Sequence, residues 1–258
     1  MEVTREERTN MARLELQHVG FAYEADRPVF EDVSFIVEAN ETVGIIGANG
    51  VGKSTLLKLI VGLEMIGRGE IRIDGEPLTD KTVASLRRKE GYVFQDAESQ
   101  LFMGTVYEDV AFAPRNYGAD RETVEEKVVN ALELTGISHL RNRHIYKLSG
   151  GEKKLASIAT ILSTEPEIIL MDEPSVALDP CNRDKLIRVI NGLPGMKLLA
   201  SHDLDFIYDT CQRTLVLANG GIVYEGSTEQ VLKDKTFLEQ YGLRLPLSFR
   251  FGVGRECR

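Results

Sequence analysis

One loop constrains this chain more than any other stretch of its sequence. Residues 47–55 read Gly-Ala-Asn-Gly-Val-Gly-Lys-Ser-Thr and match the pattern G-x-x-x-x-G-K-[ST] at every fixed position. The apolar run at 41–46 predicts a buried strand before the loop, and apolar residues at helical spacing between 56 and 63 predict a helix after it. This is the setting that the pattern requires. The alternative is an ordinary glycine-rich turn between a strand and a helix.

The residue types of this phosphate loop, residues 47–55, explain how it would hold phosphate. Glycines at 47, 50 and 52 permit positive φ angles and close approach of the backbone, so several N–H groups can point at phosphate oxygens. The N-terminus of the following helix adds a partial positive charge. We expect Lys53 to reach the β- and γ-phosphates and the Ser54 hydroxyl to bind Mg²⁺.

Composition limits the classes of protein that this chain can represent. With 258 residues and 43% hydrophobic content, it can bury a sizeable core. Its formal net charge of −9 argues against broad electrostatic attraction to nucleic acid. No apolar run approaches the ~18 residues of a membrane span, and residues 1–8 lack the apolar segment of a signal peptide. The three cysteines show no C-x-x-C spacing, and Cys211 lies on an apolar helical stripe, which predicts a core position.

The order of the patterns predicts an α/β fold. We expect a mostly parallel sheet around the phosphate loop and an inserted α-helical subdomain at about 96–165. The domain would span 13–246, between polar tails at 1–12 and 247–258. Tyr23 is expected in a loop between two short strands, and Asn219-Gly220-Gly221 predicts a hairpin turn. Helices are expected at 80–89, 183–193 and 228–241.

Two adjacent acids follow an apolar strand at 167–171. Asp172 is placed to hold Mg²⁺, directly or through water, and Glu173 to polarise an attacking water molecule. The alternative is that both are solvated acids that cap the next helix.

The segment 148–152 reads Leu-Ser-Gly-Gly-Glu and resembles the signature of ATP-binding cassette (ABC) ATPases, which is L-S-G-G-Q or L-S-G-G-E. It lies just before the strand that carries Asp172 and Glu173, as it does in that family. The same residues also predict a capping box, in which Ser149 and Glu152 begin a helix at 152–162. The two interpretations are compatible, because a hydroxyl and N–H groups at a helix start are also suited to a γ-phosphate.

The resemblance extends from about residue 14 to residue 246 and implies a P-loop ATPase core with an N-terminal antiparallel β subdomain. It also implies roles for individual residues. It implies that Tyr23 stacks on adenine, that Gln95 senses Mg²⁺ and faces a membrane partner, and that His202 contacts the γ-phosphate. The catalytic set would consist of Glu173, His202, Lys53 and Gln95. The nucleotide-binding loop would include Gly47, Asn49, Gly50, Gly52, Lys53, Ser54 and Thr55, and the Mg²⁺ ligands would be Ser54, Gln95 and Asp172.

The resemblance also implies a dimer that binds ATP between its subunits. In the family, the signature of one subunit completes the nucleotide site of the other, head to tail. Ser149, Gly151 and Glu152 would therefore act on the partner's ATP. The segment 175–179 resembles the loop that joins the two sites, with Asp179 as its key position. The partner is expected to be a second copy or a paralogous ATPase subunit.

Within the family, residues 93–102 look most like the ATPase of energy-coupling-factor importers, including cobalt and nickel uptake systems. Those proteins typically read V-F-Q-D-P-x-x-Q-L-F, and residues 241–246 resemble their C-terminal segment. Ala97, Leu155 and Val176 depart from the usual residues, but none of them removes a catalytic group.

The resemblance implies that the chain hydrolyses ATP to power a membrane importer of a metal ion or a vitamin. It would sit at the cytoplasmic face of the membrane as a peripheral subunit, bind an integral membrane subunit and make no contact with nucleic acid or the transported solute. Two alternatives are a soluble ABC ATPase without a transport role and a subunit that binds nucleotide without turnover.

Overall fold

The computed structural model describes residues 13–24 and 26–250. They belong to two compact units. The first comprises the residues up to 87 together with those from 195 onward, and the second comprises 88–194. The predicted tail at 1–12, most of the predicted tail at 247–258 and Cys257 lie outside the described residues.

The first unit is a mixed sheet with helices. Its elements are β1 (Arg13–Glu24), β2 (Arg27–Glu38), β3 (Thr42–Ile46), α1 (Lys53–Ile60), β4 (Arg68–Ile73), β5 (Glu76–Pro77), α2 (Val83–Leu86), β8 (Met196–Ala200), α7 (Leu204–Thr210), β9 (Arg213–Ala218), β10 (Gly221–Ser227), α8 (Thr228–Lys233), α9 (Lys235–Gln240) and α10 (Leu247–Arg250). The strand order is β5-β4-β1-β2-β10-β9-β3-β8.

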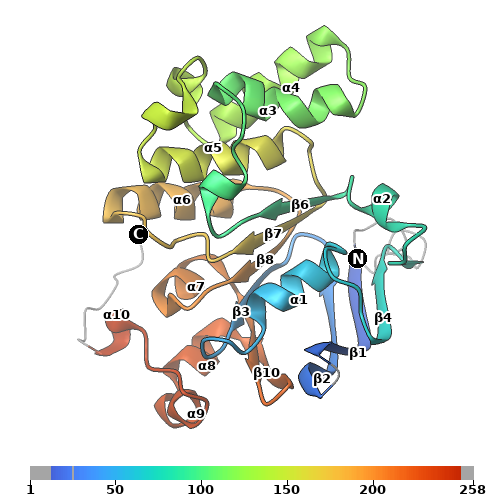
Figure 1. Cartoon of the computed structure of the whole chain (residues 1–258). Helices are drawn as coiled ribbons and strands as arrows, with labels where there is room; N and C mark the ends of the chain where they lie inside the picture. The colour runs from blue at the N-terminus through green and yellow to red at the C-terminus, as the bar shows by residue number, and fades with distance from the viewer. Residues whose placement is uncertain (1–12, 25, 251–258) are drawn as a thin grey trace, which may run out of the picture. The chain divides into compact units, whose positions relative to one another are not determined.

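The phosphate loop leaves the parallel part of this sheet. β3 pairs in parallel with β8 on one side and with β9 on the other. All five residues of β3 and of β8 are buried, as expected of strands covered on both faces. α1 buries Leu56, Leu57, Leu59 and Ile60 after the loop. The predicted strand, loop and helix are therefore confirmed (Figure 1).

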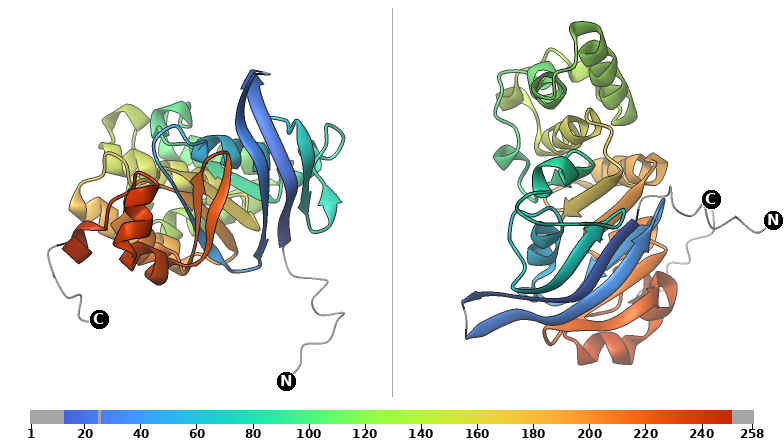
Figure 2. Two further views of the ribbon diagram at one scale, coloured as in Figure 1. Left: turned by 90° about the horizontal axis from the view of Figure 1, so that it is seen from below. Right: turned by 90° about the vertical axis from the view of Figure 1, so that its right-hand side faces the viewer.

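The N-terminal strands are antiparallel and longer than predicted. β1 pairs with β2 and with β4, and the first pair forms a long hairpin, drawn in blue in Figure 2. The prediction that Tyr23 lies in a loop is wrong, because β1 continues to Glu24. The alternating pattern ends early because the β1–β2 register shifts after Leu16, close to His18, which has a φ of 50°.

One of the other local predictions is confirmed, and two helices differ from their predicted lengths. The hairpin at Asn219–Gly220 is confirmed: β9 and β10 are antiparallel, and both turn residues have positive φ, as a type I′ turn requires. The helix predicted at 80–89 is shortened to α2. The helix predicted at 228–241 is two helices, because Asp234 leaves the helical conformation and accepts a hydrogen bond from the N–H of Phe237 at the start of α9.

The second unit is mainly helical. Its elements are β6 (Glu90–Val93), α3 (Val106–Asn116), α4 (Arg121–Leu134), α5 (Gly150–Leu162), β7 (Ile168–Asp172), α6 (Pro180–Gly192) and 3₁₀ turns at Ala97–Ser99, Ser138–Leu140 and Ile145–Lys147. β6 and β7 pair in parallel, and α3 and α4 lie over α5 (Figure 1). The predicted helix at 183–193 begins three residues earlier, where Asp179 caps α6 and Pro180 takes its first position.

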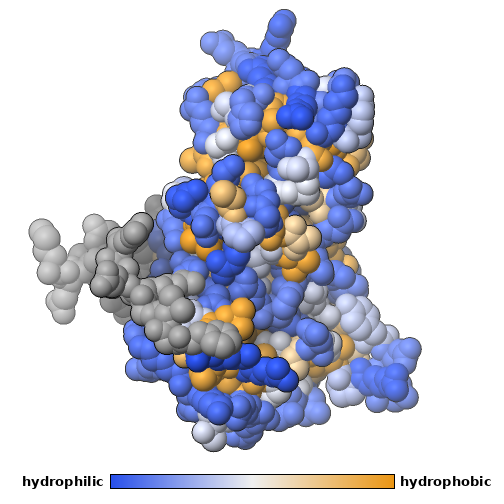
Figure 3. Space-filling view, turned by 90° about the vertical axis from the view of Figure 1, so that its left-hand side faces the viewer, coloured by the Kyte–Doolittle hydropathy of each residue, from blue (hydrophilic) through white to orange (hydrophobic). Residues whose placement is uncertain are grey.

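These elements confirm the predicted fold class. Parallel strands carry the phosphate loop, the N-terminal strands are antiparallel, and the chain leaves the first unit for a largely helical segment before it returns. Cys211 is buried, as its position on an apolar stripe predicts. Among the described residues, no helix has the length and apolar character needed to span a bilayer. The face seen in Figure 3 mixes hydrophilic and hydrophobic side chains.

Candidate active site

Backbone conformation or close packing requires glycine at positions 47, 50 and 52 of the phosphate loop. Gly50 and Gly52 have φ angles of 78° and 105°, in the region that glycine enters without strain. A Cβ at Gly52 would lie 2.7 Å from side-chain atoms of both Val29 and Phe30, and one at Gly47 would lie 2.5 Å from the carbonyl oxygen of Leu217. A Cβ at Gly50 would meet no described atom within 4 Å, so the loop is open at that position.

Lys53 and Thr55 lie on the first turn of α1, directly after the loop glycines. Lys53 is only 7% exposed, and its Nζ donates to the carbonyl oxygens of Gly47 at 3.1 Å and Ala48 at 3.4 Å. This ammonium group therefore already lies over the start of the loop, where a phosphate would need a positive charge. Thr55 Oγ1 lies 3.2 Å from the hydroxyl of Tyr23.

Tyr23 combines an anchored hydroxyl with an exposed ring. Its side chain is 56% exposed, and its ring packs edge to face on Phe21 at 4.8 Å between centroids. The contact with Thr55 ties β1 to the first turn of α1. A flat base could lie on the open face of the ring, as predicted for adenine.

The first unit places His202 beside the phosphate loop. Ile45 pairs with Ala200 in the parallel β3–β8 ladder, so both strands end at the same edge of the sheet. His202 follows β8 and is exposed, and Asp203 caps α7 by accepting from the N–H of Phe206 at 2.9 Å. A cavity of about 420 Å³ is lined by Gly47, Asn49 and His202, among others.

Asp172 is the last residue of β7 in the second unit, and Glu173 follows it. Asp172 and Glu173 are 6% and 7% exposed, and the hydroxyl of Tyr92 donates to Asp172 Oδ2 at 3.4 Å. The interpretation of the acids as solvated helix caps is wrong, because both are buried and α6 is capped by Asp179. Glu173 has a φ of 45°, an uncommon conformation for a residue with a side chain.

The signature segment, residues 148–152, begins α5 with the predicted capping box. Ser149 Oγ accepts from the N–H of Glu152 at 3.3 Å, and Glu152 Oε2 accepts from the N–H of Ser149 at 2.8 Å. This second hydrogen bond is the main cause of a lowered pKa of Glu152. The Glu152 carboxylate therefore stays charged and holds Ser149 at the N-terminus of α5.

Gly151 brings the signature segment against the loop that carries Asp179. A Cβ at Gly151 would lie 2.5 Å from Cγ of Asn182. Asn182 donates to Asp179 from its backbone N–H at 3.0 Å and from Nδ2 at 2.6 Å. The backbone hydrogen bond is the main cause of a lowered pKa of Asp179. The second unit thus places two of the segments predicted to face a partner subunit side by side.

Gln95 lies in a segment that two side chains attach to α5. Lys154 is 3% exposed and donates from Nζ to the carbonyl oxygens of Phe94 at 2.9 Å and Gln95 at 2.7 Å. Gln100 accepts from the N–H of Phe94 at 3.2 Å and donates to the carbonyl oxygen of Ser157 at 2.7 Å. The backbone of Gln95 is therefore held by the helix that the signature segment begins.

Sequence reasoning missed Lys154. A signal was present, since Lys154, Ile158 and Ile161 share one helical face and a lysine on an apolar stripe is a candidate for burial. Burial lowers the pKa of Lys154 to about 8, against the opposing effect of the Asp96 and Asp172 carboxylates. Lys154 fixes the backbone of Phe94 and Gln95 against α5.

The lowered pKa of Lys154 predicts a specific pH dependence of stability. The folded chain would release this proton near pH 8, whereas an unfolded chain keeps it to about pH 10.4. Between these values the unfolded state binds more protons, so the lysine favours folding increasingly as pH rises. From pH 8 to 9.5, wild type should gain about 1–2 kcal/mol of unfolding free energy relative to Lys154→Gln. Urea denaturation at each pH measures this, with Lys185→Gln on α6 as the control. Equal trends in the two variants would contradict the assignment.

Comparison with known proteins identifies the family of this chain. Residues 30–176 match the family described as ABC transporter. A Gloeobacter violaceus protein, whose name places it among ABC transporter ATP-binding proteins, is 43% identical over 237 residues, which cover 91% of this chain and 97% of that protein. The energy-coupling factor transporter ATP-binding protein EcfA of Methanothermobacter thermautotrophicus is 39% identical, over 90% of this chain and 76% of the relative.

A solved structure extends the match to the fold. The structure of cbiO1 from Clostridium perfringens, described as part of the ABC transporter complex cbiONQ, has a TM-score of 0.81 and 30% identity. It covers 93% of this chain, and this chain covers 96% of it. The chain therefore belongs to the ABC transporter ATP-binding proteins and is the ATPase subunit of a transporter.

Proposed function

We propose that this ATPase powers an importer of the energy-coupling-factor type, for a metal ion such as cobalt or nickel or for a vitamin. The observation that carries the proposal is likeness over nearly the whole chain to EcfA of M. thermautotrophicus and to cbiO1 of C. perfringens. The sequence at 93–102 supports the same subgroup. ATP and Mg²⁺ are the proposed substrate and cofactor, at the cytoplasmic face of the membrane.

The proposed nucleotide contacts use groups already in suitable surroundings. Lys53 and the backbone amides of the phosphate loop would bind the β- and γ-phosphates, His202 would contact the γ-phosphate, and Tyr23 would stack on the base. The remaining loop residues of the predicted set, Asn49, Ser54 and Thr55, stay assigned to the same nucleotide.

Glu173 is the residue that we propose to polarise the attacking water. Its carboxylate is buried at the end of a strand, which limits its movement. The oxygens of Ser54, Gln95 and Asp172 are the kinds that Mg²⁺ prefers, and bound Mg²⁺ supplies charge neutralisation of the phosphates.

The proposed working unit is a head-to-tail dimer, with a second copy or a paralogue. Ser149, Gly151, Glu152 and Asp179 would act on the partner's nucleotide. The contact between Gly151 and Asn182 supports this, because it joins the signature segment to the loop of Asp179 and lets both approach a partner as one surface.

An exposed aromatic pair favours a membrane subunit as a further partner. Phe102 is 64% exposed and Phe112 36%, and their rings pack edge to face at 4.8 Å between centroids. Asp109 is buried and accepts from the N–H groups of Phe102 and Met103, both at 3.1 Å, which fixes the loop that presents Phe102. Exposed apolar side chains held in this way indicate a protein contact. The segment of Gln95, which the family directs to its membrane partner, begins seven residues earlier.

Recovery of membrane partners tests the proposal. Tagged chain co-expressed with the genes beside its own should retain integral membrane subunits in detergent, and mass spectrometry should identify them. Phe102→Asp should reduce that recovery about tenfold or more, because losing a central aromatic contact costs about 2 kcal/mol or more. Leu134→Asp changes another exposed apolar residue of the second unit and should have little effect. Retention of ribosomes in place of membrane subunits would contradict the transport role.

A further inference from the structure

The chain that follows α9 runs back past the start of the phosphate loop. α9 ends at Gln240, and Gly242 has a φ of 72°; the N–H of Leu243 then bonds to the carbonyl of Leu238 at 2.8 Å. This left-handed turn reverses the chain. A Cβ at Gly242 would lie 3.9 Å from that of Ala48, so the C-terminal segment, residues 242–250, passes close to the loop.

The C-terminal segment is docked at its far end. Asp205 of α7 accepts hydrogen bonds from the N–H groups of Leu247 at 2.8 Å and Ser248 at 3.2 Å. The ring of Phe249 packs edge to face on Tyr208 of the same helix, at 4.9 Å between centroids. Asp205 lies three residues after His202, so the segment is held by the helix that follows the predicted switch histidine.

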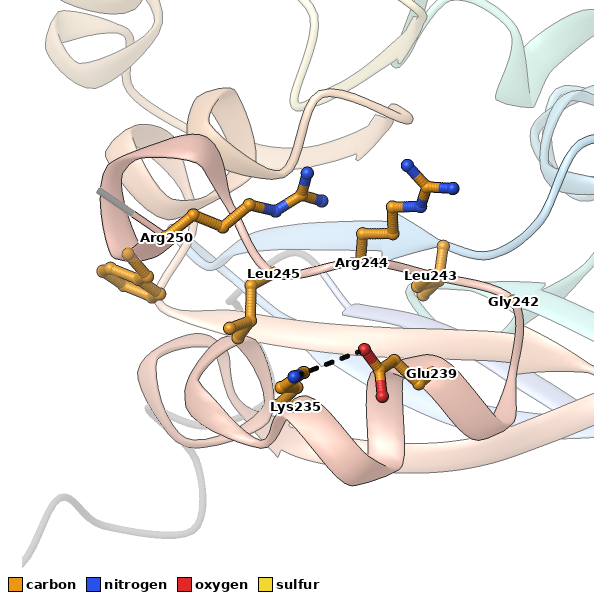
Figure 4. A pocket seen from close by; sticks show the side chains of 8 residues that line it. Lys235, Glu239, Gly242, Leu243, Arg244, Leu245 and Arg250 are labelled. Atoms are coloured by element: carbon orange, nitrogen blue, oxygen red, sulfur yellow. Dashed lines mark ion pairs between the residues drawn. The ribbon is translucent and has the colours of Figure 1, made fainter. Parts of the chain in front are cut away.

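Two arginines of this segment point to one side. In Figure 4, the guanidinium groups of Arg244 and Arg250 both point away from Lys235 and Glu239, whereas Leu245 points toward them. The residues drawn in Figure 4 line a cavity of about 680 Å³. Arg244 and Arg250 also line a second cavity, of about 420 Å³, with Asn49 and His202.

The charged groups that line the second cavity differ in their hydrogen bonding. Its carboxylates, Asp203 and Asp205, accept hydrogen bonds from backbone N–H groups. Within the part of the chain that the structure describes, the guanidinium groups of Arg244 and Arg250 have no hydrogen-bond or ion-pair partner. Two unpaired guanidiniums beside a phosphate loop suit a phosphate group, which arginine binds with two parallel hydrogen bonds.

We propose that the C-terminal segment is part of the nucleotide site and that Arg244 contacts the terminal phosphate of ATP. This inference rests on the proposed assignment of ATP to the phosphate loop and adds a contact beyond residues 30–176, where the family match ends. Because ADP lacks the γ-phosphate, the contact would favour ATP over ADP. Asp205 acts as the positioning residue that keeps the segment over the loop.

Nucleotide affinities of the full chain test the inference. Arg244→Ala should weaken MgATP binding about tenfold and leave MgADP binding within twofold, because a charge-assisted hydrogen bond is worth roughly one such factor. Arg244→Lys should recover part of the loss. Arg188→Ala, which removes an exposed arginine of α6, should change neither affinity.

A second variant separates a phosphate contact from a loss of folding. Asp205→Ala retains the Arg244 side chain but removes the acceptor of two hydrogen bonds that dock the segment, so it should lower the ATP-to-ADP affinity ratio in the same direction. Unchanged ATP affinity in Arg244→Ala, or equal losses for ATP and ADP, would overturn the inference. Absence of MgATP binding by wild type would instead refute the nucleotide assignment itself.

Discussion

Replacing Glu173 by glutamine should lower ATP hydrolysis on the order of 10²-fold or more and leave ATP binding close to that of wild type. General acid–base groups contribute factors of this size, and glutamine retains the shape of the side chain but cannot take up a proton. Glu173 is buried at the end of β7, so a side chain of equal size should keep its position. Its φ of 45° is set by the backbone on both sides and is equally available to glutamine.

The measurement is phosphate release under saturating ATP, paired with nucleotide affinity. Glu167→Gln removes an exposed carboxylate just before the same strand and should leave turnover unchanged. If the signature segment acts across a dimer, Glu173→Gln with MgATP should also accumulate as a dimer in size-exclusion chromatography, because the closed state is no longer consumed. Turnover like that of wild type in Glu173→Gln would contradict the role of Glu173.

The sequence predicts those parts of the site whose structure depends on residues close together in the chain. The phosphate loop needs glycines at fixed places for reasons of local backbone geometry, so its pattern identifies it. The capping box of Ser149 and Glu152 is likewise a local arrangement, and both of its hydrogen bonds form. The hairpin at Asn219–Gly220 depends on two positive φ angles that these residues adopt easily.

The parts that sequence missed depend on contacts between distant segments. Lys154 matters because its ammonium group meets carbonyls at positions 94 and 95, about 60 residues away along the chain. Arg244 lies nearly 200 residues after the loop whose cavity it lines, and a turn at Gly242 brings it there. The sequence places Tyr23 in a loop because strand bulges interrupt the alternation on which strand prediction depends. Spacing can mark Lys154 as a candidate for burial, but neither composition nor spacing identifies the distant groups that Lys154 and Arg244 meet.

The phosphate loop offers the largest expected effect on stability, because two of its glycines differ in what surrounds them. Gly52 has a φ of 105°, and its missing Cβ leaves room for Val29 and for Phe30, which is 2% exposed. Gly50 also has a positive φ, but a Cβ there would meet no described atom within 4 Å. Alanine at Gly52 therefore adds overpacking to backbone strain, whereas alanine at Gly50 adds strain alone.

Gly52→Ala should lower the free energy of unfolding by roughly 2–6 kcal/mol, the sum of a strained backbone and an overfilled core, and Gly50→Ala by roughly 1–2 kcal/mol. Urea denaturation of the nucleotide-free chain measures both without reference to ATP. Gly52 also precedes Lys53 at the start of α1. If the added methyl group displaces this turn, ATP binding should weaken more than tenfold. Equal stability of the two variants would show that Val29 and Phe30 yield to the added methyl group, and the close packing inferred at Gly52 would then be wrong.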